Sequence, residues 1–114
     1  MNREIQQFKA GFFKALSHPL RIRILEELSK GELGVNEIQN VIGSNGSTIS
    51  QQLMVLRNKN IVVGTKSGNR VFYSLRDPLV INLLSITNHM FNNHLVDTIN
   101  IFDKFQDNEE QEFQ

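Results

Sequence analysis

Five basic side chains and no acidic one lie in the stretch from Ser44 to Arg76, although the formal net charge of the chain is zero. Phosphate groups are attracted by local positive charge and not by the total, so this stretch could bind a nucleic-acid backbone. A solvated basic face without a ligand is the alternative. The five residues are Arg57, Lys59, Lys66, Arg70 and Arg76.

The neutral total hides a division of charge along the chain. Residues 1–76 contain 11 Lys or Arg and 5 Asp or Glu, whereas residues 77–114 contain 1 Lys and 7 acids. The first part therefore carries +6 and the second −6. The first 76 residues could therefore attract a polyanion.

The basic stretch contains a predicted helix, from about Ser47 to Asn58. This helix is the second helix of a predicted helix-turn-helix. Its apolar side chains are spaced at i, i+4 and i+7, which gives one buried face. Residues 43–46 read as a tight turn, and a preceding helix is predicted to begin near Gly34. Two short helices across a glycine-containing turn form this motif. The buried faces are predicted to be Ile38, Val41 and Ile42 on the first helix, and Ile49, Leu53 and Leu56 on the second.

Two runs of β-branched and aromatic residues follow, at 61–66 and 70–75, with Ser67-Gly68-Asn69 between them. Gly-Asn supplies the positive-φ positions that a tight hairpin turn needs. A β-hairpin placed after a helix-turn-helix is a wing. The sequence therefore predicts a single winged-helix domain over residues 1–114, mainly α, with the element order α-α-α-α-β-β-α.

Two helix starts are marked by capping residues. His18 and Pro19 suit the start of the second helix, and Asp77-Pro78 suit the start of the last helix.

The first and last helices are predicted to form a dimer interface. The last helix, with apolar positions through Phe105, should be about 40 Å long, more than a small domain can cover. We expect dimerisation helices at residues 1–17 and 78–106, and an acidic flexible tail at 107–114. The predicted interface residues are Phe8, Phe12, Leu84, Met90, Phe91, Leu95 and Phe102.

The second helix of the motif is the predicted reader of base sequence in double-stranded DNA. Residues near the N-terminus of such a helix reach base edges, and the amide of Gln51 could pair with adenine N6 and N7. Basic wing residues would hold the phosphates and position the protein. The predicted DNA-binding residues are Asn45, Ser47, Thr48, Ser50, Gln51, Gln52, Arg57, Lys59, Lys66, Asn69 and Arg70.

Other chemistry is poorly supported by the residues. The chain contains no cysteine, so thiolate metal sites and disulfides are excluded. No Ser/His/Asp set, carboxylate pair or phosphate loop is visible, and we expect neither an enzyme nor a cofactor. The polar N-terminus and the lack of a long apolar run predict a cytoplasmic protein without a membrane segment.

Three segments resemble the ArsR/SmtB winged-helix repressors. They are Phe13–Leu25, with Ser17-His18-Pro19-Leu20-Arg21; Ser47–Arg57; and Val71–Leu75. The resemblance covers roughly residues 8–85, and it implies a homodimer built on the first and last helices that represses transcription from a roughly palindromic operator. The family usually has His-His where this chain has Gln51-Gln52, a difference expected to change sequence preference and not the mode of binding.

Many members of that family release DNA when a metal binds, but the corresponding ligand positions depart from the pattern here. The Cys-Val-Cys site of the family corresponds to Gly34-Val35-Asn36. The last-helix site, shared across the dimer, corresponds to Asp77, Leu79, Met90 and Asn93. Both metal sites are therefore predicted to be absent. His94 and Asp97 share a helical face but make only half a site, and His89 faces elsewhere.

Two alternatives stay open from the sequence. One is a winged-helix module that binds proteins and has lost its DNA function, although a protein-binding surface has no reason to exclude every acid from Ser44–Arg76. The other is a repressor that responds to a metal of another kind or to a small ligand on the last helix.

Overall fold

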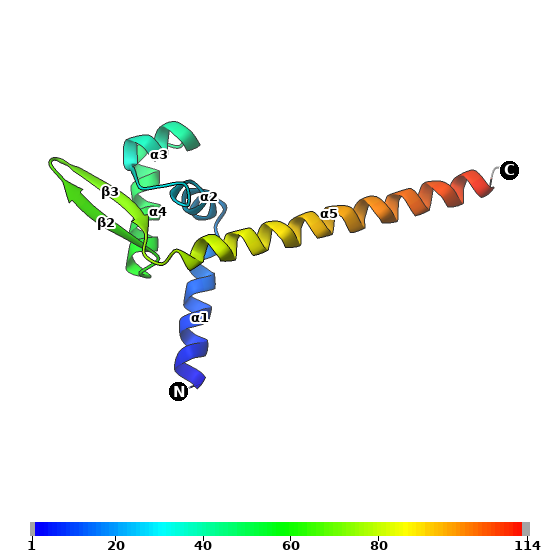
Figure 1. The fold of residues 1–114 in the computed structure, drawn as a ribbon, viewed down its shortest axis with the longest axis horizontal. Helices are drawn as coiled ribbons and strands as arrows, with labels where there is room; N and C mark the ends of the chain where they lie inside the picture. Colours follow the sequence, from blue (N-terminus) through cyan, green and yellow to red (C-terminus); the bar gives the residue numbers. More distant parts are fainter. Residues whose placement is uncertain (1, 113–114) are drawn as a thin grey trace. The chain divides into compact units, whose positions relative to one another are not determined.

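The computed structural model describes residues 2–112, with side chains through residue 108, and divides into two compact units, residues 1–81 and 82–114 (Figure 1). The order of elements is the predicted one with one short strand added. The elements are α1 (Asn2–Leu16), α2 (Pro19–Leu28), β1 (Leu33–Gly34), α3 (Val35–Ile42), α4 (Gly46–Asn58), β2 (Val62–Ser67), β3 (Arg70–Leu75) and α5 (Leu79–Glu112).

Side-chain caps set the starts of three helices. His18 Nδ1 accepts a hydrogen bond of 3.2 Å from the Leu20 N–H at the start of α2, so the predicted histidine cap is confirmed. Asn45 caps α4, and the Asp77 carboxylate accepts from the Leu79 N–H at 3.0 Å. Each cap satisfies a backbone donor that has no partner within its helix.

The core of the first unit is formed by one face each of α2, α3 and α4, together with Val62 of β2. The predicted inward face of α4 is confirmed, but that of α3 is only partly right. Ile38 is fully buried, whereas Val41 is 50% exposed and Ile42 is half-buried. Val41 lies in the last turn of this eight-residue helix, close to the exposed Gly43 that ends it, and its side chain is therefore not covered. The fully buried large side chains are Ile24, Leu25, Ile38, Ile49, Leu53, Leu56 and Val62.

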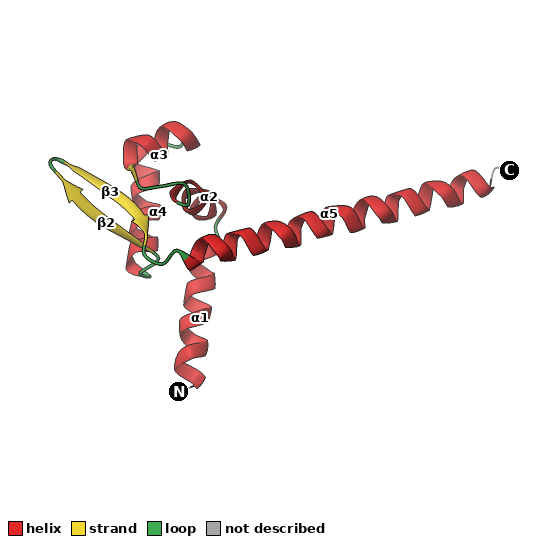
Figure 2. Cartoon of the chain, viewed as in Figure 1, coloured by secondary structure: helices red, strands yellow, loops and turns green. Residues whose placement is uncertain are grey.

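The wing is part of a three-stranded antiparallel sheet in the order β1-β3-β2 (Figure 2). The predicted hairpin is confirmed, with Ser67 opposite Arg70 and a two-residue turn between them. Of the two turn residues only Gly68 takes a positive φ, 62°, so the expectation for Asn69 was wrong. Strand β1 was not predicted, because two residues are too few to show a period; it places Gly34 opposite Phe72.

The last helix is longer than predicted. It continues through Glu112, so residues 107–112 are helical and the predicted boundary at 106 was wrong; residues 113 and 114 lie outside the described part. No Gly or Pro follows Pro78, and nothing in the sequence therefore forces the helix to end. At 1.5 Å per residue, its 34 residues give about 51 Å.

An apolar stripe runs along α5 through Leu84, Phe91, Leu95, Phe102 and Phe105, with spacings of 7, 4, 7 and 3 residues. Such spacing keeps side chains on one seam of a helix that faces another helix. Phe91 and Phe102 are each 59% exposed. The stripe is therefore uncovered from Phe91 to Phe105 in the single chain, whereas Leu84 is half-buried. Met90, also exposed, lies on a different face. Among the described residues no helix has the length and hydropathy to cross a membrane.

Candidate nucleic-acid interface

The exposed face of α4 is narrower than the sequence indicated. Ile49, Leu53 and Leu56 turn inward, and a continuous outward stripe remains on the opposite side. These positions are three or four residues apart and so lie above one another along the helix. The outward stripe consists of Ser47, Ser50, Gln51, Met54, Arg57 and Asn58. Thr48 and Gln52 are half-buried beside it.

Sequence reasoning missed two residues of this stripe, Asn58 and the apolar Met54. The Met54 side chain is 63% exposed, one turn beyond Ser50 and Gln51. An apolar residue within a helical pattern is normally assigned to the core, and the sequence motif gave no reason to do otherwise. The signal that could have found it is angular: Met54 is one residue beyond the buried Leu53, about 100° around the helix.

Asn45 holds the N-terminus of α4. Its side-chain oxygen accepts from the Thr48 N–H at 2.9 Å and from the Ser47 hydroxyl at 2.8 Å. The oxygen that Asn45 would use to contact DNA is thus already occupied in capping the helix. The cap fixes where the helix begins, and this places Ser47 at the start of the outward stripe.

Gln52 is engaged within the protein and does not share the face of Gln51. Its amide oxygen accepts a 2.8 Å hydrogen bond from Arg21 Nε, and Arg21 Nη1 reaches the carbonyl oxygen of Ala15 at 3.3 Å. One guanidinium therefore joins α4 to α2 and to the end of α1. The sequence alone could not show which of the two adjacent glutamines, Gln51 or Gln52, would be exposed.

The wing presents Lys66 and Asn69 as exposed side chains, but it does not leave Arg70 free. The Arg70 guanidinium forms an ion pair with Glu37 of α3 and lies 4.7 Å from the centre of the Phe72 ring. The other oxygen of Glu37 accepts from the Gly34 N–H. Hydrogen bonding from Arg70, aided by that N–H, holds the pKa of the Glu37 carboxyl below its ordinary value.

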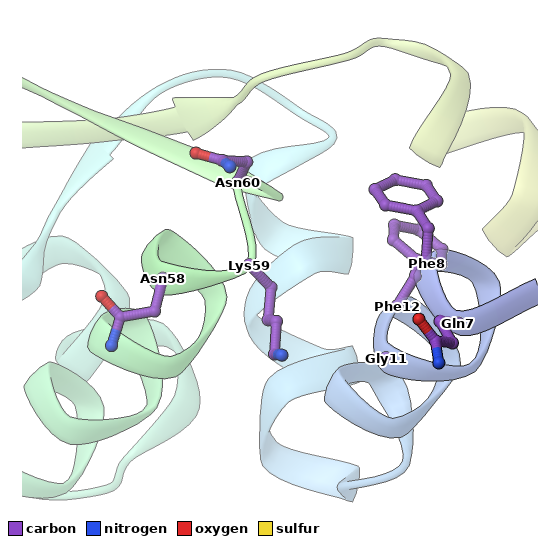
Figure 3. A pocket seen from close by; sticks show the side chains of 7 residues that line it. All are labelled: Gln7, Phe8, Gly11, Phe12, Asn58, Lys59 and Asn60. Carbon is purple, nitrogen blue, oxygen red and sulfur yellow. The ribbon is translucent and has the colours of Figure 1, made fainter. Parts of the chain in front are cut away.

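Lys59 is directed toward α1. A pocket of about 200 Å3 lies between α1 and the residues that end α4, and Figure 3 shows Lys59 among its lining side chains with Phe8 and Phe12. A Cβ at Gly11 would lie 3.7 Å from the ammonium nitrogen of Lys59. The structure therefore separates Lys59 from the outward stripe, with which the sequence had grouped it.

Possible metal ligands are not gathered in the part of the chain whose side chains are described. Among residues 2–108, no three His, Cys, Asp or Glu side chains are close enough to hold one ion. The predicted absence of a metal sensor stays a prediction, because a site shared between two protomers would contribute only part of its ligands from each.

Comparison with known proteins agrees with this geometry. The model of the arsR family of bacterial regulatory proteins matches residues 18–63, from the cap of α2 into β2. The HTH-type transcriptional regulator Rv0081 of Mycobacterium tuberculosis is 36% identical over 100 residues, covering 87% of this chain and 88% of the relative. The biofilm growth-associated repressor of Xylella fastidiosa is 37% identical over 76 residues, covering 67% of each chain.

Solved structures of similar fold also come from transcriptional regulators and DNA-binding domains. The crystal structure of Rv0081 has a TM-score of 0.76 and 38% identity, covering 83% of this chain and 96% of that one. The solution structure of the homodimeric winged helix-turn-helix DNA-binding domain Mb0332 from Mycobacterium bovis has a TM-score of 0.76 and 28% identity, covering 82% and 87%. This chain therefore belongs to the arsR family of bacterial regulatory proteins and is a winged helix-turn-helix, DNA-binding transcriptional regulator.

Proposed function

We propose that the chain acts as a homodimeric repressor that binds a roughly palindromic operator and blocks transcription from it. The observation that carries the proposal is the outward stripe of α4 beside a wing, on a segment that contains no acid between Ser44 and Arg76. The homodimer is supported by the uncovered apolar stripe of α5 and by the homodimeric relative from Mycobacterium bovis.

The contacts follow from which side chains are exposed. Gln51 reads an adenine through its amide, and Ser50 donates a hydrogen bond near the helix N-terminus. The Ser47 hydroxyl donates to Asn45, and its oxygen can accept a hydrogen bond from a base amino group. Met54 makes apolar contact with a thymine methyl group, the partner that suits a side chain without hydrogen-bonding capacity. Arg57 and Lys66 bind phosphates, and Asn69 lies at the tip of the wing. In a dimer, two copies of α4 about 34 Å apart reach successive major grooves.

The test is binding of the purified protein to duplexes from its own promoter region, followed by fluorescence anisotropy over a range of salt concentrations. If Arg57 and Lys66 of both protomers each neutralise one phosphate, four contacts give a slope of log K against log salt of about −3.6. Scrambled duplexes of equal length serve as the control. Failure to bind any duplex at low salt would favour the alternative, a module that binds proteins.

We infer that the protein is a cytoplasmic regulator without catalytic activity, cofactor or membrane partner, and that its operator binding does not depend on a metal. The departures at Gly34 and Asn36, and at Leu79, Met90 and Asn93, support the last point, because these side chains are poor metal ligands.

A further inference from the structure

The wing is joined to the helix-turn-helix by a side-chain clamp as well as by the sheet. Arg70 belongs to β3, and Glu37 belongs to the first turn of α3, 33 residues earlier in the chain. Glu37 uses one oxygen for Arg70 and the other for the Gly34 N–H. Both oxygens of the carboxylate are thus occupied, and the guanidinium is held over the ring of Phe72.

Gly34 shows how closely this clamp is built onto the backbone. A Cβ at this position would lie 2.6 Å from Glu37 Oε2 and 2.9 Å from Arg70 Nη2, both shorter than any normal contact. Gly34 also pairs with Phe72 in the β1–β3 ladder. Any larger residue would push the ion pair away from the strand that it supports.

Resting on the proposed function, we propose that Arg70 is a positioning residue that sets the wing relative to α3 and α4, and not a phosphate contact. The wing and the outward stripe of α4 must meet one duplex at the same time, so their relative placement determines affinity. Arg70 has its charge compensated by Glu37, half of its side chain is covered, and its guanidinium is stacked. Lys66, on the neighbouring strand β2, keeps an exposed ammonium group for phosphate.

The two roles predict opposite signs for Glu37→Gln. If Arg70 were a free phosphate contact, removing the negative charge of Glu37 would strengthen DNA binding by reducing repulsion. In the clamp, Gly34 and Arg70 donate to different oxygens of Glu37, and glutamine replaces one of these oxygens with an NH2 group that cannot accept, so one of the two hydrogen bonds is lost. The wing then loosens, and operator affinity falls roughly two- to fivefold although the surface has become more positive.

The experiment measures operator affinity for the full chain, Glu37→Gln, Arg70→Ala and the double variant, with Lys66→Ala as the matched control. We expect each single clamp variant to weaken binding and the double variant to be no weaker than Arg70→Ala, because both remove one interaction. The salt slope should stay unchanged in Arg70→Ala and become shallower by about one per protomer in Lys66→Ala. Tighter binding by Glu37→Gln, or a slope in Arg70→Ala reduced as in the control, would overturn the proposal.

Amide hydrogen exchange provides a readout that needs no DNA. Both single variants should speed exchange in strand β3 and at Gly34, while Lys66→Ala should leave exchange there unchanged. If the wild-type chain binds no duplex, the proposed function fails, and exchange alone then decides the clamp. Unchanged exchange in both clamp variants would refute it.

Discussion

Replacement of Phe91 by alanine should dissociate the dimer without unfolding the protomer. Phe91 is 59% exposed in the single chain, in the middle of the apolar stripe of α5. Of the ~200 Å2 of a phenylalanine, about 120 Å2 is thus available to a partner, worth about 3 kcal/mol at ~25 cal/mol per Å2.

The effect is doubled because a symmetric dimer contains two copies of each change. Allowing for the methyl group that alanine keeps, we expect about 4–6 kcal/mol per dimer, or a rise in the dimer dissociation constant of roughly 10^3–10^4-fold. Sedimentation equilibrium measures this constant directly. Far-UV circular dichroism should be unchanged, because an exposed side chain contributes little to the protomer.

Val96→Ala provides the matched control. Val96 is 55% exposed on the same helix, but it lies five residues from Phe91, about 140° around the helix. Its replacement should leave the dissociation constant nearly unchanged. The reasoning fails if Phe91→Ala remains dimeric at nanomolar concentrations, or if both variants weaken the dimer to the same extent.

Three further outcomes are expected. Gln51→Ala should relax preference at one base pair in each half-site, costing about 1–3 kcal/mol there, and equal loss on every sequence would contradict base reading by this amide. Because the folded pKa of Glu37 is lowered, its contribution to wing stability should be complete above the ordinary Glu pKa of about 4.3 and be lost as the pH falls through the lowered value. An NMR titration of the carboxyl checks this, and Arg70→Ala should raise its midpoint. Adding zinc or a chelator should leave operator affinity unchanged, and zinc-triggered release would show that a metal site exists.

The fold could be predicted from local signals where these were strong. Glycines, prolines and capping side chains marked the helix starts, and the apolar period of α4 gave its buried face. The end of α5 was missed because polar residues without Gly or Pro are compatible with both helix and coil. Strand β1 depends on pairing with β3, a contact about 40 residues away along the chain, and no local pattern reveals it.

The candidate site was predicted by residue type more reliably than by direction. Basic and amide side chains were identified by type, but exposure then separated Gln51 from Gln52, and the ion pair with Glu37 separated Arg70 from Lys66. Each of these distinctions rests on a partner from a distant segment, Arg21 in one case and Glu37 in the other. Such pairings are set by tertiary packing and are not visible as a spacing along the chain.

The bonds of Arg21 have a mechanical consequence. Because one planar guanidinium holds both a carbonyl at the end of α1 and the amide of Gln52, a tilt of the first helix would be transmitted to the neighbour of Gln51 through two hydrogen bonds. A signal that altered the packing of α1 in the dimer would thereby change the position of Gln51 and the bases that it reads, without a ligand contacting the outward stripe of α4.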